Sequence, residues 1–275
     1  MQWETIASGY GLVEGPTIDG AGGIYFSDVL GGGVHHADAD GNVEVVVPKR
    51  RGVGGLALHA RGGVVCSGRD IVHVRDGDTR TLFAIEGLPG WNDLCTDEQG
   101  RVYAGALRFA VFDRNADAVP GEAWRIDREG AATELYGGII HANGIALAPD
   151  ERAIYHSDTR AHCVLMHDVD AGGTVTGSRA LDTSAYGDPD GMAVDDTGCI
   201  WVAILGGFGI ARFTPAGALD RRVEVPASIT TSVCFGAGGD LYVTTADNTD
   251  DPQRRGCLLR TSIGVAGAPV HPARI

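Results

Sequence analysis

Long apolar runs, a basic leader segment and closely spaced cysteine pairs are all missing from this sequence of 275 residues. No stretch is long and apolar enough to cross a bilayer as a helix, so a membrane protein is not expected. The first residues, MQWETIASGYG, have neither a basic nor an apolar region, so we expect no signal peptide. The six cysteines lie far apart without a CxxC motif, which predicts buried free thiols and a cytoplasmic protein.

Positive charge is scarce as well. Lys and Arg total 22 against 36 Asp and Glu, a formal net charge of −14, and the one basic cluster is the short PKRRG at 48–52. An acidic surface repels phosphate backbones, so nucleic acid is not an expected partner. A metal cation and a small carbonyl substrate fit this charge better.

Helical patterns are also few. No run of more than ten residues has apolar positions at i, i+3, i+4 and i+7. Glycine is abundant instead, with 42 residues scattered singly and in pairs, as in a chain with many turns. An apolar fraction of 44% is ordinary for a globular protein with a substantial core.

Six segments repeat one pattern, in which a Gly-rich turn precedes an apolar strand and a DG-like turn follows later. The strands are GIYFSD (23–28), GVVCSG (63–68), RVYAGA (101–106), AIYHSD (153–158), CIWVAI (199–204) and DLYVTT (240–245). A unit of about 40–50 residues with about four strands is typical of a propeller blade. The opening WETIA has no unit of its own, and the last unit has too few strands. We therefore predict one all-β domain over 1–275, a six-bladed β-propeller closed by the N-terminal strand. Because a propeller closes its own sheet edges, a monomer or small homo-oligomer is expected.

One position of the repeat has a carboxylate or carboxamide side chain in four of the six units. Counted back from the second strand by ten residues, or eleven in the fourth unit, the position is occupied by Glu14, Gly54, Asn92, Asn143, Asp190 and Thr231. The first strand of every propeller blade lines the central channel, so these residues should face one another at one mouth. Their oxygens are hard ligands suited to Ca²⁺, Mg²⁺ or Mn²⁺.

Ordinary turn chemistry is the alternative for each of these motifs. Asn-Gly, Pro-Asp-Gly and Asn-Asp are common in turns. Asp190 can form an Asx-turn, and Glu14 can cap a strand or pair with an Arg. A generic turn would vary its position, however, whereas these four side chains share one register. We therefore favour a metal site.

Five segments, in this order and at these spacings, resemble the senescence-marker-protein/gluconolactonase/luciferin-regenerating-enzyme family, also called regucalcin-like lactonases. They are EGPTID, WNDLCTDEQGRVYAGA, ANGIALAPDERAIYHSDT, PDGMAVDDTGCIWVA and TSVCFGAGGDLYVTTA. The resemblance covers essentially the full length and implies a six-bladed propeller. It further implies one divalent cation, Ca²⁺ first and Zn²⁺, Mn²⁺ or Mg²⁺ as alternatives, held by Glu14, Asn143 and Asp190. Asn92 would lie beside it, in contact with the substrate or a water on the metal. The implied reaction is lactone hydrolysis, with Asp190 as general base.

One position departs from the family pattern. Sugar-lactone members usually have an Arg two residues before the Asn of the ND motif, where this chain has Gly90, followed by Trp91. The change predicts a less hydroxylated, more apolar substrate than gluconolactone. Trp91 and Phe109 are candidate substrate contacts, and packing between blades is the alternative for both.

Signatures of other sites are missing or incomplete. There is no GxSxG elbow and no HExxH motif. His156, His162 and His167 lie on alternating strands, where surface or core positions are expected rather than a zinc site. The polar segment 246–256 is expected to be a loop. Two further functions stay open: a metal-dependent lyase or isomerase acting on a carbonyl compound, and a non-catalytic calcium-binding propeller.

Overall fold

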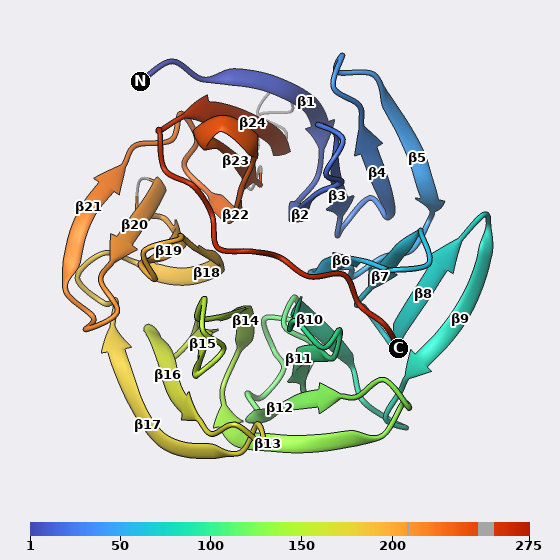
Figure 1. The fold of residues 1–275 in the computed structure, drawn as a ribbon, viewed down its shortest axis with the longest axis vertical. Coiled ribbons are helices and arrows are strands. Elements are labelled where there is room, and N and C mark those ends of the chain that lie inside the picture. The colour runs from blue at the N-terminus through green and yellow to red at the C-terminus, as the bar shows by residue number, and fades with distance from the viewer. Residues whose placement is uncertain (208, 247–255) are drawn as a thin grey trace.

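The structure is a computed structural model that describes residues 1–207, 209–246 and 256–275 of the chain. Within these ranges the strands form six four-stranded sheets, which stand in a ring around a central axis (Figure 1). This confirms the predicted six-bladed β-propeller. The loop expected at 246–256 lies, apart from its two end residues, outside the described residues.

The first three blades follow one another along the chain, each with its first strand nearest the axis (Figure 1). Blade 1 consists of β2 (Val13–Ile18), β3 (Ile24–Asp28), β4 (Gly33–Ala37) and β5 (Val43–Pro48). Blade 2 consists of β6 (Leu56–Leu58), β7 (Val64–Cys66), β8 (Ile71–Arg75) and β9 (Asp78–Phe83). Blade 3 consists of β10 (Gly90–Thr96), β11 (Val102–Leu107), β12 (Gly121–Ile126) and β13 (Ala132–Ile139).

The last three blades repeat this order. Blade 4 consists of β14 (Ala142–Leu147), β15 (Ala153–Asp158), β16 (Cys163–Val169) and β17 (Val175–Asp182). Blade 5 consists of β18 (Asp188–Val194), β19 (Ile200–Leu205), β20 (Gly209–Phe213) and β21 (Leu219–Val223). Blade 6 consists of β22 (Thr230–Phe235), β23 (Asp240–Thr245), β24 (Gly256–Ser262) and, outermost, β1 (Glu4–Tyr10).

The N-terminal strand closes the ring as the sequence predicted. β1 pairs antiparallel with β24, so that Glu4 lies opposite Arg260 and Tyr10 lies opposite Gly256. The Arg260 guanidinium also forms an ion pair with Glu4 at 2.6 Å. A 3₁₀ turn at Ala237–Gly239 precedes β23. Within the described residues, no helix is long and apolar enough to span a bilayer.

Packing between neighbouring blades makes the core. The second strand of each blade is mostly buried, and in β19 it is apolar along its length, with Ile200 to Ile204 all buried. The outer strands carry the polar residues instead, as in β21 (LDRRV), which is mostly exposed. Because burying one large apolar side chain contributes about 1.5–3 kcal/mol, the inter-blade contacts hold the ring together.

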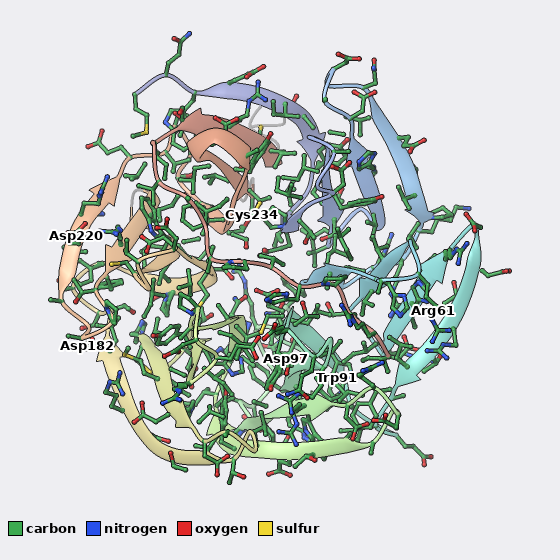
Figure 2. All side chains as sticks on the ribbon, in the orientation of Figure 1. Arg61, Trp91, Asp97, Asp182, Asp220 and Cys234 are labelled. Atoms are coloured by element: carbon green, nitrogen blue, oxygen red, sulfur yellow. The ribbon has the colours of Figure 1, made fainter. Side chains whose placement is uncertain are left out.

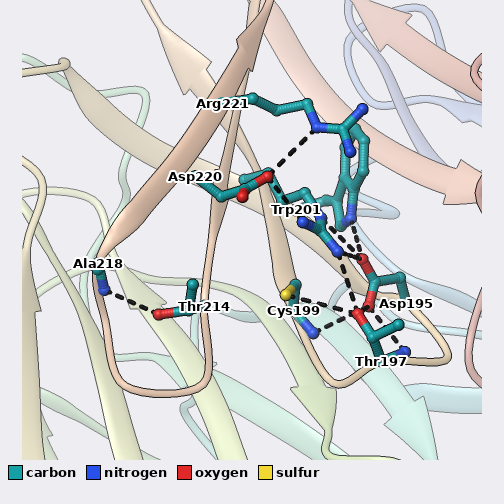
Figure 3. Close-up of polar contacts among 9 residues, drawn as sticks. Asp195, Thr197, Cys199, Trp201, Thr214, Ala218, Asp220 and Arg221 are labelled. Atoms are coloured by element: carbon teal, nitrogen blue, oxygen red, sulfur yellow. Dashed lines mark hydrogen bonds and ion pairs between the residues drawn. The ribbon is translucent and has the colours of Figure 1, made fainter.

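An aspartate at the end of the inner strand fixes the following hairpin of blade 5 (Figure 3). The buried Asp195 accepts hydrogen bonds from the backbone N–H groups of Thr197 and Cys199, at 3.0 and 2.9 Å. It also accepts from Trp201 Nε1 at 2.8 Å and from Arg212 Nε at 2.9 Å. Burial raises the pKa of Asp195, but the hydrogen bonds from Thr197, Trp201 and Arg212 outweigh it and hold the pKa below its ordinary value. A charged carboxylate thus anchors the far end of β18.

The C-terminal segment after β24 crosses one end of the channel (Figure 1). The Ala268 N–H donates to Val194 O at 2.9 Å, and the Ala273 N–H donates to Leu58 O at 2.8 Å. Val194 and Leu58 are the last residues of their inner strands. The segment therefore covers the end where the inner strands finish, and the starts of these strands face the other end.

Two buried histidines flank Tyr136 in blades 3 and 4. The rings of Tyr136 and His167 stack with centroids 3.7 Å apart, and the Tyr136 hydroxyl lies 3.1 Å from His156 Nδ1. Burial lowers the pKa of His156 to about 3 and that of His167 to about 4. Both rings are therefore neutral near pH 7. His162, the third histidine of this stretch, is exposed and pairs with Asp188 at 2.7 Å.

These shifts predict loss of stability in acid. The unfolded chain binds a proton at each of these histidines below about pH 6.5, whereas the folded chain does not until the pH falls to about 4 or 3. The free energy of unfolding should therefore fall as the pH drops from 6.5 to 4. His156→Asn keeps a polar group near the Nδ1 position but cannot bind a proton. In this variant the free energy of unfolding should fall less steeply with decreasing pH, by up to about 1.4 kcal/mol per pH unit, because one proton fewer is taken up on unfolding. Urea unfolding at a series of pH values measures this. Equal slopes in the wild-type protein and in His156→Asn would contradict this explanation.

Candidate functional site

The repeat position defined from the sequence lies on the inner strands. Glu14 is in β2, Asn92 in β10, Asn143 in β14 and Asp190 in β18, and all four are near the starts of their strands. These starts face the end of the channel opposite the C-terminal segment. Four polar residues from four blades thus surround one mouth of the channel.

A β-bulge occurs at this position, or directly after it in the case of Glu14, in five of the six inner strands. In blade 4, for example, Ala142 pairs with Asp158 but Ile145 pairs with His156, so β14 has one residue more than β15 between these pairs. A bulge bends a strand and re-aims the side chain at that point. The Asn143-Gly144 and Asp190-Gly191 motifs are therefore bulges in a strand rather than turns, and each bulge sets the direction of one side chain.

Glycine follows two of these side chains because the inner strands come very close there. A Cβ at Gly144 would lie 2.5 Å from Asp190 O, and a Cβ at Gly191 would lie 2.1 Å from Ser232 Oγ. Both distances are far below van der Waals contact. The glycines thus let β14, β18 and β22 approach one another, which brings Asn143 and Asp190 together.

The site concentrates negative charge in a buried place. Glu14 and Asp190 are 7% and 3% exposed. Burial, then Asp190 and Asp93, raise the pKa of Glu14 well above its ordinary value. Burial and Asp93 do the same to Asp190, although hydrogen bonding from Asn143 opposes the rise. Burial also raises the pKa of Asp93 to about 7. Among the described residues none of these three carboxyl groups forms an ion pair.

Asp93 was not singled out in the sequence, although it follows Asn92 directly. It lines a cavity of about 460 Å³ inside the channel, together with other inner-strand residues and Gly267–His271 of the C-terminal segment. Its electrostatic effect on Glu14 and Asp190 shows that it adjoins the site from the interior of the channel. Only the ND dipeptide in the sequence pointed toward it.

The residues at the mouth fit a hard divalent cation. Asp190 Oδ1 is buried and has no hydrogen-bond partner among the described residues. Glu14 and Asp190 repel each other, and a cation between them would remove that cost. Two carboxylates and the carboxamide of Asn143 supply oxygen donors, as Ca²⁺, Mg²⁺ and Mn²⁺ prefer.

Asn92 connects two blades next to this group. Its Nδ2 donates to Ala142 O at 2.9 Å, and a Cβ at Gly54 would lie only 2.0 Å from its Oδ1. The carboxamide of Asn92 thus fills the space that a side chain at Gly54 would need. The glycine at this repeat position could not be explained from the sequence, whereas this contact explains it.

Phe109 lies beside the start of β14, in a cluster that the sequence did not predict. Its ring is 5% exposed and is covered by Arg160, whose Cζ lies 4.6 Å from the ring centroid. His141, directly before β14, meets the same ring edge-on with centroids 6.2 Å apart. Burial and the nearby Arg160 lower the pKa of His141 to about 4. The mouth near Asn143 is thus bordered by an aromatic ring, a neutral imidazole and a guanidinium.

Trp91 lies in the core between blades 2 and 3, away from the axis (Figure 2). Its side chain is 1% exposed and packs against Leu88 and Phe83, the latter with ring centroids 5.5 Å apart. Packing between blades accounts for this position, and contact of Trp91 with a substrate stays a prediction.

Comparison with known proteins places this geometry in context. The family model described as the SMP-30/gluconolactonase/LRE-like region matches residues 12–247. The 6-deoxy-6-sulfogluconolactonase of Pseudomonas putida is 31% identical over 264 residues, covering 89% of this chain and 88% of the relative. The pentonolactonase XacC of Haloferax volcanii is 28% identical over 266 residues, covering 90% and 88%. Among solved structures, a calcium-binding protein named regucalcin from Agrobacterium tumefaciens superposes with a TM-score of 0.86 at 25% identity, covering 98% of this chain and 95% of that one. The chain belongs to the SMP-30/gluconolactonase/LRE-like family.

Proposed function

We propose that this protein is a cytoplasmic, divalent-metal-dependent hydrolase that opens a small lactone. The observation on which the proposal rests is the buried pair Glu14 and Asp190, which has no basic partner among the described residues and lies next to Asn143 at the channel mouth. Family membership supports the choice of reaction, since two of the similar proteins are named as lactonases. Ca²⁺ is the first candidate cation, because a similar structure is named as a calcium-binding protein.

Each residue of the site has a role in this reaction. Glu14, Asn143 and Asp190 would hold the cation, which supplies a Lewis acid for the lactone carbonyl when bound. Asp190 has an oxygen free of hydrogen bonds among the described residues, so it is suited to take a proton from the attacking water. The water oxygen bonds to the carbonyl carbon, the ring C–O bond breaks, and the proton passes from Asp190 to the ring oxygen. Asn92 orients the substrate through the part of its carboxamide not bonded to Ala142.

The substrate we propose is less hydroxylated than gluconolactone. Gly90 leaves open the position where sugar-lactone members have an Arg, because a Cβ there would meet only Gly68, at 3.5 Å from its carbonyl oxygen. No guanidinium from this position can therefore bind substrate hydroxyls. Phe109 is buried beneath Arg160, beside His141, and would add an apolar contact to the substrate only where the Arg160 side chain moves aside.

Replacing the proposed base should separate stability from activity. In the metal-free protein the pKa of Asp190 is higher in the folded state than in the unfolded state. As the pH rises above the ordinary pKa, the unfolded chain loses this proton first, so the free energy of unfolding falls. Asp190→Asn should therefore raise the melting temperature of the chelated protein at pH 7, while turnover falls at least about 100-fold. Asp188→Asn, which changes a half-exposed carboxyl two residues away, is the control and should keep turnover. Turnover above about a tenth of wild type in Asp190→Asn would contradict the assignment.

A lactone panel tests reaction and substrate together. Acid release at constant pH from chelated enzyme should be restored by added Ca²⁺, Mn²⁺, Zn²⁺ or Mg²⁺, and less hydroxylated lactones should exceed gluconolactone in kcat/KM. Gly90→Arg should shift the kcat/KM ratio toward gluconolactone by about ten-fold or more, since a hydrogen bond to a charged group contributes about 1.5–3 kcal/mol. Gly90→Ala is the matched control without the guanidinium and should leave the ratio near that of wild type.

Three results would contradict the proposal at different levels. Gluconolactone as the best substrate of the wild-type enzyme would contradict the substrate class. Metal binding without acid release from any lactone would favour a lyase or isomerase. Metal binding with no chemistry on any carbonyl compound would favour a non-catalytic calcium-binding propeller.

A further inference from the structure

Three consecutive buried residues lie at the end of β15. Two of them bond the proposed metal ligands Asn143 and Asp190, and the third bonds the chain that leads to Asn143. Ser157, Asp158 and Thr159 are 0%, 2% and 6% exposed. They belong to blade 4, yet their hydrogen bonds reach both the inner strand of that blade and the inner strand of blade 5. These two inner strands carry Asn143 and Asp190.

Ser157 and Thr159 fix the backbone at the bulge of β18. The Ser157 hydroxyl donates to Asp190 O at 2.7 Å, and the Thr159 hydroxyl donates to Pro189 O at 2.8 Å. Two neighbouring carbonyl groups are thereby tied to one short segment of blade 4. The direction of the Asp190 side chain depends on this backbone, because the bulge sets it.

Thr159 also decides which way the carboxamide of Asn143 is turned. The single hydroxyl proton of Thr159 goes to Pro189 O, so the hydroxyl can only accept from its other neighbour. That neighbour is Asn143 Nδ2, at 3.1 Å. Because the amide nitrogen faces Thr159, Oδ1 is turned away from it and stays available as a ligand. A flipped amide would present N–H groups to a cation instead.

Asp158 holds the chain that leads into β14. One carboxylate oxygen accepts from the Ile140 N–H at 2.7 Å, and the other accepts from the His141 N–H at 3.0 Å. The Thr159 N–H donates to His141 O at 3.1 Å in addition. The backbone two residues before Asn143 is thus fixed by the same segment.

The equivalent segments of other blades show which part of this arrangement is general. Ser27 in blade 1 and Ser67 in blade 2 have the same repeat position as Ser157 and bond the backbone just before β6. Ser27 donates to Val53 O of the next blade at 2.6 Å, and Ser67 accepts from the Gly54 N–H of its own blade at 3.1 Å. A buried serine that bonds the backbone at this position therefore recurs in three of the six blades. The Thr159 position is occupied by threonine only in blade 4, since the other blades have Val29, Arg69, Leu107, Leu205 and Ala246 there.

We propose that Ser157, Asp158 and Thr159 are positioning residues that set the distance between Asn143 and Asp190 and turn Asn143 Oδ1 toward the cation. The inference rests on the proposed metal-dependent function. None of the three residues touches substrate. They act through Asn143 and Asp190, which lie on the inner strands of different blades.

The test measures cation binding without turnover. Chelated protein is titrated with Ca²⁺ alone and with Mn²⁺ alone in a calorimeter, and the melting temperature of each metal-free variant is recorded. Thr159→Val keeps the shape but loses both hydrogen bonds, and its Kd should rise about ten-fold or more, the usual effect of removing such a partner. Thr159→Ser retains the hydroxyl and should bind within about three-fold of wild type.

Ser157→Ala and Ser67→Ala form the matched pair. Both variants lose a buried serine hydroxyl at the same repeat position, so their melting temperatures should fall by similar amounts. Only Ser157→Ala should weaken cation binding, because blade 2 has Gly54 in place of a ligand. If Thr159→Val does not fold, this pair and Thr159→Ser still decide the question.

The possible outcomes separate the two proposals. Wild-type affinity in both Thr159→Val and Ser157→Ala, with tight binding by the wild-type protein, would overturn the positioning role alone. Equal weakening in Ser157→Ala and Ser67→Ala would also overturn it, since a general loss of stability would then explain the effect. No binding of either cation by the wild-type protein would overturn the proposed metal-dependent function itself.

Discussion

Repulsion between buried carboxyl groups at the mouth of the channel is the constraint on which the rest of the account depends. Glu14 and Asp190 come from blades far apart in the sequence, and Asp93 adds a third carboxyl from the interior of the channel. Burial of like charges costs folding free energy unless a cation or a proton compensates them. A fold has no stability reason to retain such a group. A cation at the proposed site would remove this cost, and Ser157 and Thr159 fix the backbone that carries two of its proposed ligands.

The propeller repeat supplies the means to build this site. Each blade places the start of its inner strand at the same mouth, so one repeat position becomes a ring of neighbours (Figure 1). A bulge at that position re-aims one side chain per blade, and small residues such as Gly144 and Gly191 let adjacent strands approach. The other end of the channel has a different task, because the C-terminal segment crosses it and bonds the last residues of the inner strands. The proposed cation site and the segment that covers the channel thus lie at opposite ends of it.

Much of this could be predicted from the sequence, because the evidence was periodic. Six similar strands and an incomplete last unit predicted the six blades and the closure by β1, and the structure confirms both. The shared register predicted which side chains lie at the mouth. Contacts between blades could not be predicted, since they join residues with no pattern in common. The cover of Arg160 over Phe109, the burial of Trp91 away from the axis and the bond between Thr159 and Asn143 all depend on how one blade packs on the next. The bulges were hidden for another reason: an Asn-Gly pair looks the same in a turn and in a bulged strand.

The most direct test of the central claim is a crystal structure of the protein grown with Mn²⁺, with anomalous diffraction recorded at the manganese edge. We predict one strong anomalous peak at the channel mouth, from a metal bonded to oxygens of Glu14, Asn143 and Asp190, with Asn143 Nδ2 still hydrogen-bonded to Thr159. A peak elsewhere, or bound metal that does not touch Glu14 and Asp190, would contradict the claim that these three residues form one metal site.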